Sequence, residues 1–301
     1  MTTTSPHEAF LQAFHAEYPA VTAEAFGRGR APDGRSSYEV LCDRVAGSPR
    51  VLDLGCGDGV LLDVLASSPG RQLAGVDLSA HSLALARRRP ALSEAALAQG
   101  RAQELPFADG SFDACVSHMA LMLMSEIEHV AAEVARVLSP GGVLACAVGG
   151  GAVGGEAYER FLTLLRRTIE EAPASQRIPA MGDRRTRSRE GLDEVLGPAG
   201  FAAVDWESVP IDLSGPVEQV WAAVSGLYDL GPLDRPTVER LRNAFFAEVA
   251  DMTTPDGNVP CAFRVHLATT RLCQPAAPTE PARSIAVKDR AESADAAWLR
   301  A

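Results

Sequence analysis

The chain has 301 residues, of which 47% are hydrophobic, and a formal net charge of −11. This length suits one large α/β domain, or one domain with a smaller cap, and the acidic charge argues against nucleic acid as the main partner because such interfaces need a positive field. No apolar run reaches the ~18 residues of a membrane-spanning helix, and residues 1–10 lack the features of a secretory signal, so we expect no membrane partner.

Residues 1–48 predict two helices separated by a Gly- and Arg-rich loop over 27–35. The first carries apolar residues at helical spacing, and the second covers Ser37–Val45.

From Arg50 to Val148, strands and helices alternate along the chain. Strands are expected at Val51–Leu54, Leu73–Asp77, Ala95–Gln99, Phe112–Ser117 and Val143–Val148, and helices at Val60–Ala66, Ala80–Arg89 and Glu126–Leu138. Such alternation predicts a doubly wound, mostly parallel sheet with helices on both faces.

After Gly149 the pattern changes, and we interpret the glycines of 149–155 as a flexible linker. Helices are then expected at Glu156–Glu171, Glu190–Leu196, Val217–Leu227 and Thr237–Val249, and strands at Val204–Val209 and Ala262–Thr269. The strands bring the sheet to about seven, and the helices of 150–273 form an inserted cap over its carboxyl edge. Residues 274–301, rich in Ala, Pro, Ser and charge, predict a disordered tail.

The six cysteines form no Cys-x-x-Cys pair, which favours reduced thiols and a cytoplasmic location. No cluster of His, Asp or Glu at ligand spacing indicates a metal site.

The segment Val51–Gly59 carries the most specific chemical signal. A buried strand runs into a turn with glycines at 55, 57 and 59, where a ligand can approach the backbone without meeting a Cβ. The third glycine comes one place too early for the dinucleotide fingerprint, and Val60 stands where that fingerprint has glycine. Asp53 at the strand end would repel a pyrophosphate but would suit an ammonium group.

Asp77 ends the second strand, where an acidic side chain can accept hydrogen bonds from both ribose hydroxyls. The alternative is an exposed residue that caps the following helix. Because Asp77 follows the glycine turn in the expected order along the chain, the ribose contact is the favoured interpretation.

Four segments together resemble the successive motifs of class I S-adenosylmethionine (SAM)-dependent methyltransferases. They are Val51–Gly59, Val76–Ser79, Leu105–Asp113 and Arg136–Gly142. The resemblance covers roughly 48–148, with a weaker match at Leu196–Phe201, and implies a Rossmann-like fold. Residues 1–48 would then close over the cofactor, 49–149 would bind it, and 150–273 would add the cap.

The resemblance also implies roles for individual residues. Asp53 and the Gly55–Gly57 backbone would hold the amine and carboxylate of the methionine part, Asp77 the ribose, and Leu78 the adenine. Relatives often read the adenine amino group with an acidic residue where this chain has Arg101, so Ala102 and Gln103 are the expected substitutes. The complete expected set is Asp53, Gly55, Cys56, Gly57, Asp77, Leu78, Ala102, Gln103, Ser117 and His118.

Methyl transfer needs mainly a positioned nucleophile, so the sequence is poor at naming catalytic residues. The candidates are His118, which follows the fourth strand and could act as a base, Tyr38, which could touch the methionine carboxylate or close the acceptor pocket, and Tyr228 on the cap. Each has a structural alternative as a packing or loop residue. Trp221 and Asp229 are further candidates for lining the acceptor site.

The leading interpretation is a methyltransferase for a small-molecule acceptor, and the sequence is compatible with a role in secondary metabolism and with a homodimer. A second interpretation is an enzyme that cyclises the aminobutyl part of SAM to azetidine-2-carboxylate and releases methylthioadenosine, with Tyr38, His118 and Tyr228 forming a closed polar pocket. A third is a non-catalytic SAM-binding partner, which the intact glycine turn disfavours. Val60 and the family motifs make a nicotinamide-dependent oxidoreductase less favoured still.

Overall fold

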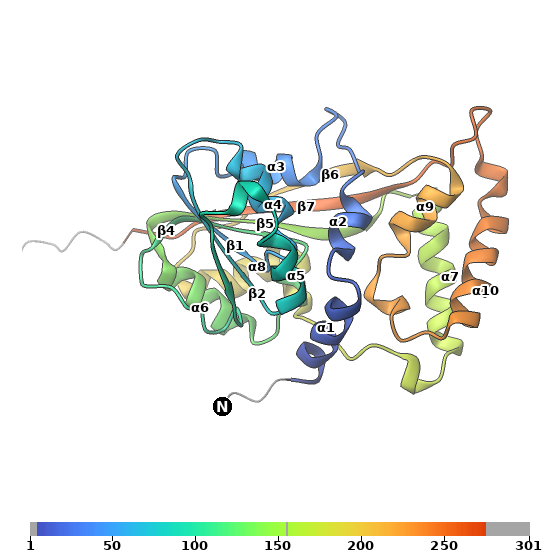
Figure 1. Cartoon of the computed structure of the whole chain (residues 1–301), viewed down its shortest axis with the longest axis horizontal. Coiled ribbons are helices and arrows are strands. Elements are labelled where there is room, and N and C mark those ends of the chain that lie inside the picture. The colour runs from blue at the N-terminus through green and yellow to red at the C-terminus, as the bar shows by residue number, and fades with distance from the viewer. Residues whose placement is uncertain (1–4, 155, 275–301) are drawn as a thin grey trace, which may run out of the picture.

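The computed structural model describes residues 5–154 and 156–274 (Figure 1). The tail expected after residue 274 lies outside this part of the chain. Within it, every helix is too short or too polar to cross a lipid bilayer.

A seven-stranded sheet forms the centre of the molecule, in the order β3-β2-β1-β4-β5-β7-β6. β1 to β5 run parallel, whereas β7 pairs antiparallel with both β5 and β6. The strands are β1 Arg50–Leu54, β2 Gln72–Asp77, β3 Ala96–Gln99, β4 Phe112–His118, β5 Leu138–Ala152, β6 Asp205–Asp212 and β7 Ala262–Arg271. The sheet confirms the α/β class and the mostly parallel arrangement expected from the sequence.

Helices cover both faces of the sheet because neighbouring side chains of a strand point to opposite sides. In β1, Val51 packs in the cluster shared with α3 (Ser37–Asp43), α4 (Val60–Ala66) and α5 (Ala80–Ala86). Leu52 packs instead with α6 (Ile127–Val137) and α8 (Arg189–Leu196). Each fully buried leucine of these clusters contributes about 1.5–3 kcal/mol to folding.

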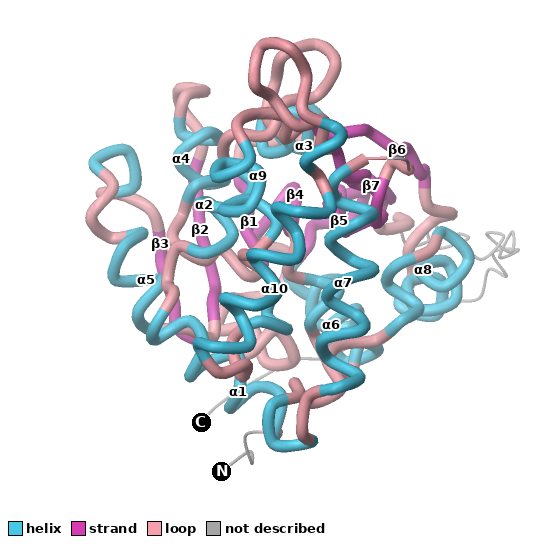
Figure 2. The backbone as a smooth tube through the Cα atoms, turned by 90° about the vertical axis from the view of Figure 1, so that its right-hand side faces the viewer, coloured by secondary structure: helices cyan, strands magenta, loops and turns pink. Residues whose placement is uncertain are grey.

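Three helices form a separate layer beyond the strand ends, which Figures 1 and 2 show from two sides. They are α7 (Ala157–Glu171), α9 (Val217–Val224) and α10 (Arg235–Glu248). The ring centroids of Phe161 and Trp221 lie 5.9 Å apart, and Phe245 lies 5.8 Å from each. Trp221 is thus a packing residue of this cap and does not line the pocket described below.

Residues 5–48 contain three helices, one more than expected: α1 (Pro6–Glu17), the short α2 (Val21–Phe26) and α3. Ser5 and Glu8 form a capping box at the start of α1, and Ser36 and Glu39 form another at α3. In each box the serine accepts a hydrogen bond from the glutamate backbone N–H, and the glutamate accepts one from the serine N–H. α1 packs against α5, and α2 packs against α9, so the N-terminal region spans from the sheet to the cap.

The glycines after residue 148 belong to a strand, so the linker predicted there is wrong. β5 continues to Ala152, where we expected a flexible linker from Gly149. The antiparallel β7 supplies the reason, because Gly149 pairs with Val265 and Ala152 with Phe263. The glycines instead produce an irregularity in the register between Gly149 and Ala152.

Candidate active site

The glycine turn after β1 forms the floor of the principal pocket. Gly55, Gly57 and Gly59 have φ of +77°, +52° and +82°, which favours glycine at each position. A Cβ on Gly55 would lie 2.4 Å from the Cβ of Ala120, whereas a Cβ on Gly57 would meet open space. The turn is therefore closely packed at Gly55 and open to a ligand at Gly57.

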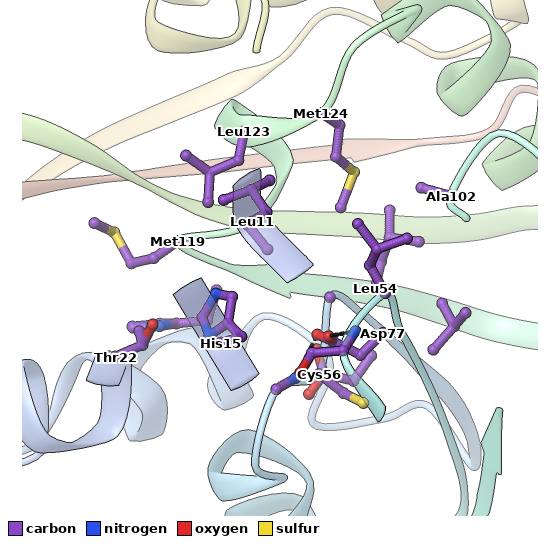
Figure 3. A pocket seen from close by; sticks show the side chains of 18 of the residues that line it. Leu11, His15, Thr22, Leu54, Cys56, Asp77, Ala102, Met119, Leu123 and Met124 are labelled. Carbon is purple, nitrogen blue, oxygen red and sulfur yellow. Dashed lines mark hydrogen bonds between the residues drawn. The ribbon is translucent and has the colours of Figure 1, made fainter. Parts of the chain in front are cut away.

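Asp77 ties the end of β2 to this turn. Its Oδ2 accepts a hydrogen bond of 2.8 Å from the N–H of Gly57, and its Oδ1 accepts one of 2.8 Å from the N–H of Ser79 (Figure 3). Burial raises the pKa of Asp77, and these two backbone donors oppose that rise. Both oxygens keep a lone pair that can accept from a vicinal diol.

Asp53 is 1% exposed, and neither of its carboxylate oxygens has a hydrogen-bond partner among the described residues. Burial raises its pKa well above the usual value, and the charges of Asp77 and Asp58 add to the rise. A buried acid without a partner is costly, so the site is poised for a cationic donor. Asp53 for an ammonium group and Asp77 for a ribose fit the amino-acid and nucleoside ends of the expected cofactor.

His118, at the end of β4, lies against the N-terminal region. Its Nε2 is 2.9 Å from the Oγ of Ser37, and its ring stacks on that of Tyr38. Burial lowers the pKa of His118 to about 3, so the ring is neutral at physiological pH. Burial likewise raises the pKa of Tyr38, with further contributions from the charges of Asp58 and Asp53.

Tyr228 enters the pocket from a short turn of 3-10 helix, Tyr228–Leu230, between α9 and α10. Its hydroxyl is 2.9 Å from the Nε2 of His15, near the end of α1. Burial raises the pKa of Tyr228, and the charge of Asp77 raises it further. Asp229 follows Tyr228 in the chain but is not among the lining residues.

Leu78, Ala102 and Gln103 also line the pocket. The amide of Gln103 donates a 2.8 Å hydrogen bond to the carbonyl of Ser125, so this side chain braces the pocket wall. Cys56 lies in the glycine turn, and burial raises the pKa of its thiol well above the usual value, which keeps it protonated.

Arg101, which stands where relatives have an acidic residue, forms ion pairs with two glutamates. Its Nε donates to Glu8 of α1 at 2.8 Å, and its Nη2 donates to Glu126 at 3.1 Å. Burial raises the pKa of Glu8, but Ser5 and Arg101 outweigh that effect and leave it lowered. Arg101 thereby clamps α1 over the pocket.

Ser117 is the one expected cofactor residue that does not line the pocket. It is fully buried, its hydroxyl donates to the carbonyl of Leu54 at 2.8 Å, and it accepts from the N–H of Leu121 at 3.1 Å. The Ser117 hydroxyl is thus used by the backbone at the ends of β1 and β4, whereas the next residue, His118, lines the pocket. The other expected residues are brought together: Tyr38, Asp53, Gly55, Cys56, Gly57, Asp77, Leu78, Ala102, Gln103, His118 and Tyr228.

From the sequence we expected residues 1–48 to close over the cofactor, but we named no residue of α1 as part of the site. His7, Glu8, Leu11, Gln12 and His15 all line the pocket, and Figure 3 labels Leu11 and His15 among the lining side chains. Their spacing of three or four residues marks one helical face, which was the available signal. The spacing does not say what that face covers.

A sequence-family model described as a methyltransferase domain matches residues 52–146. A demethylmenaquinone methyltransferase of Symbiobacterium thermophilum is 37% identical over 102 residues, which are 32% of this chain and 41% of that protein. A malonyl-[acyl-carrier protein] O-methyltransferase of Enterobacter lignolyticus is 32% identical over 198 residues, 62% of this chain and 72% of that protein. The chain thus spans less than half of the first relative and about three quarters of the second.

Solved structures share the fold at low identity. The [4+2]-cyclase SpnF matches with a TM-score of 0.56 and 20% identity, over 91% of this chain and 100% of that one. A phosphoethanolamine N-methyltransferase 2 of Haemonchus contortus, in complex with S-adenosyl-L-methionine, matches with a TM-score of 0.54 and 18% identity, over 90% of this chain and 60% of that one. At these identities the likeness concerns the fold alone.

Proposed function

The chain belongs to the class I SAM-dependent methyltransferases, and from this premise we propose that it transfers the methyl group of SAM to a small-molecule acceptor. SAM, the cofactor of this family, supplies a methyl group on a sulfonium, which is a good leaving group. The protein must therefore position the acceptor and exclude water. Within the proposal, residues 1–48 close the site, 49–149 hold the cofactor, and 150–273 carry the cap.

The observation that carries the acceptor class is the covering of the pocket. Five residues of α1 line it, Tyr228 reaches it from the cap, and the clamp between Arg101 and Glu8 holds α1 in place. A nucleophile has to fit beneath these elements, which suits a compact metabolite better than a folded protein or a nucleic acid. The net charge of −11 agrees with this choice.

In this proposal Asp53 binds the amine of the cofactor and Asp77 its ribose hydroxyls, with the Gly57 backbone free to approach. Tyr38, His118 and Tyr228 form the wall that the acceptor meets. His118 holds its ring in place through Ser37 and Tyr38, and its low pKa makes it a neutral group with an open Nδ1.

A second candidate reaction consumes SAM itself by cyclisation to azetidine-2-carboxylate. The amine nitrogen would bond to the γ-carbon, the bond between that carbon and sulfur would break, and methylthioadenosine would leave. The observation in its favour is Asp53, a buried carboxyl with a raised pKa at the proposed amine site, which can accept the ammonium proton.

One experiment separates the two candidates. The purified protein is incubated with SAM alone, and the products are identified by mass spectrometry. Methylthioadenosine together with a small imino acid, formed without an acceptor, would replace methyl transfer by cyclisation. Intact SAM bound to the protein, followed by S-adenosylhomocysteine once a small acceptor is supplied, supports the methyltransferase. Turnover only on a protein or nucleic acid would contradict the proposed acceptor class.

A further inference from the structure

The charged residues that line the pocket all lie on one part of it. Asp53 and Asp77 are at or near the ends of β1 and β2, Asp58 is in the glycine turn, Arg101 follows β3, and Glu8 of α1 is bound to Arg101. Because the sheet order is β3-β2-β1-β4-β5, these charges gather over the ends of three adjacent strands. Among the described residues that line the pocket, no other Asp, Glu, Lys or Arg occurs.

A different set of side chains lines the pocket where β4 ends, and we call it the β4 side: Tyr38, His118, Met119 and Leu123. His118 ends β4, Met119 and Leu123 follow it in the chain, and Tyr38 stacks on the His118 ring. Figure 3 shows Met119 and Leu123 well apart from Asp77. All four residues are uncharged, because burial lowers the pKa of His118 to about 3 and raises the pKa of Tyr38.

Met119 is held in an uncommon backbone conformation at this strand end. Its φ is +56°, in a region that few residues other than glycine adopt, and its N–H donates to the carbonyl of Ala147 in β5 at 2.8 Å. A Cβ on Gly149 would lie 3.4 Å from the Cε of Met119, so the thioether lies against β5. Such a conformation persists only where its surroundings enforce it, and positions of this kind cluster at ligand sites. Met119 therefore presents an apolar, polarisable surface in a fixed place.

The charged part of the pocket is occupied by the cofactor and by ion pairs within the protein. In the proposed binding mode Asp53 holds the amine of SAM and Asp77 its ribose, so the cofactor lies over β1 and β2. Asp58 pairs with Arg89 at 2.7 Å, and the clamp that holds α1 accounts for the remaining two charges. Because β1 lies between β2 and β4, the space next to the methionine part of the cofactor is the β4 side.

We propose that the β4 side is the acceptor subsite and that it takes an uncharged, apolar molecule, with Met119 as the residue that sets this specificity. The inference rests on the function proposed above and names its acceptor class. A carboxylate, phosphate or ammonium group on the acceptor would lose its water here without gaining a charged partner, which is costly. An uncharged body loses little on leaving water and buries apolar surface against Met119 and Leu123.

Binding of matched probes to the full chain, saturated with S-adenosylhomocysteine, tests the subsite without turnover. The probes are naphthol, naphthoate and naphthylmethylammonium, each substituted at the same ring position, so they share an apolar body and differ in charge near neutral pH. Isothermal titration should give a Kd for naphthol at least about 10-fold lower than the Kd for either charged probe. Equal affinities, tighter binding of a charged probe, or no binding of naphthol would overturn the proposal.

Three variants test the place of Met119 in this preference. Met119→Lys puts a positive charge on the β4 side, so the ratio of the Kd values for naphthol and naphthoate should shift by about 10-fold or more in favour of naphthoate. Met119→Leu keeps the residue apolar and should keep the wild-type order of affinities. His81→Lys adds the same charge at an exposed residue of α5 and is the matched control. An unchanged ratio in a Met119→Lys protein that still binds S-adenosylhomocysteine would show that naphthol binds elsewhere.

Failure of this inference can be told apart from failure of the proposed function. If S-adenosylhomocysteine forms only with charged small acceptors, methyl transfer stands and the uncharged subsite fails. If SAM alone yields methylthioadenosine, methyl transfer fails, and the probe affinities still decide whether the β4 side binds an uncharged molecule. The comparison of the three probes on the wild-type protein also decides the proposal if Met119→Lys does not fold.

Discussion

The rings of Tyr38 and His118 are stacked, with centroids 3.9 Å apart and planes inclined by 24°. This contact joins α3 to the end of β4 and seals one side of the pocket from water. Its physical consequence is a histidine that stays neutral far below its usual pKa, because the surrounding protein replaces the solvent that would stabilise the charge.

Stability should therefore depend on pH through His118. In the unfolded chain this histidine takes up a proton near pH 6.5, whereas in the folded protein burial delays protonation until about pH 3. Between those values the unfolded state binds more protons, so stability falls as the pH falls. From about pH 7.5 to about pH 5.5, the wild-type protein should lose about 1.4 kcal/mol more unfolding free energy than His118→Gln.

Urea unfolding of the cofactor-free proteins at the two pH values measures this difference. His129→Gln, which removes a histidine that is 72% exposed, should behave as the wild-type protein does. Equal losses in the wild-type protein and in His118→Gln would show that His118 already takes up its proton in the folded state.

Asp53→Asn should weaken SAM binding while leaving the cofactor-free protein at least as stable. The substitution removes the charge proposed to pair with the amine, and a hydrogen bond to a charged group is worth about 1.5–3 kcal/mol, or roughly 10- to 100-fold in Kd. It also removes a buried acid that has no partner among the described residues. Isothermal titration with SAM and thermal unfolding without it measure the two effects.

Asp109→Asn is the control for Asp53→Asn, because it removes a negative charge whose side chain is 81% exposed. Its Kd for SAM should match that of the wild-type protein. If Asp53→Asn binds SAM normally, the amine lies elsewhere in the pocket.

The floor of the site could be predicted from the sequence because its parts are local. Asp53, Gly55, Gly57 and Asp77 each lie where a strand ends, and the carboxyl ends of adjacent parallel strands meet at one edge. For Ser117 the sequence did not show that its hydroxyl would be used by the backbone at the end of β1, because Leu54 lies 63 residues away in the chain.

The resemblance implied that residues 1–48 cover the cofactor, but the α1 residues that line the pocket could not be predicted, because long-range contacts place them. Glu8 and Arg101 are 93 residues apart, and no local pattern connects the start of α1 to the loop after β3. The extension of β5 to Ala152 likewise depends on β7, more than a hundred residues later. Glycines that suggest a linker locally become strand residues once an antiparallel partner provides hydrogen bonds.

The clamp between Arg101 and Glu8 should control how fast the cofactor leaves. Arg101→Gln removes the partner of a glutamate that is only 4% exposed, so α1 should open more often, and S-adenosylhomocysteine should dissociate about 3- to 10-fold faster. Surface plasmon resonance measures this rate. High salt should accelerate dissociation from the wild-type protein toward that of the variant.

Glu126→Gln removes the more exposed partner of Arg101 and provides the control, with a smaller effect expected. The pH dependence has a definite sign. The pKa of Glu8 is lowered, so the clamp is intact above the usual glutamate pKa and is lost as the pH falls through the lowered value. A dissociation rate that is unchanged in Arg101→Gln would mean that α1 does not limit release.

Gly55 and Gly57, two of the three glycines of the turn, should respond differently to replacement by alanine. Both have positive φ, which costs about 1–2 kcal/mol for an alanine. At Gly55 the new methyl group would also lie 2.4 Å from the Cβ of Ala120, so Gly55→Ala should lower the thermal midpoint much more than Gly57→Ala.

The methyl group of Gly57→Ala would have no neighbour within 4 Å, so this variant should remain folded. It would place a methyl group where the cofactor is proposed to approach the backbone. Thermal unfolding and SAM titration of both variants test this division. Normal SAM binding by a folded Gly57→Ala would show that the cofactor does not contact the turn at that point.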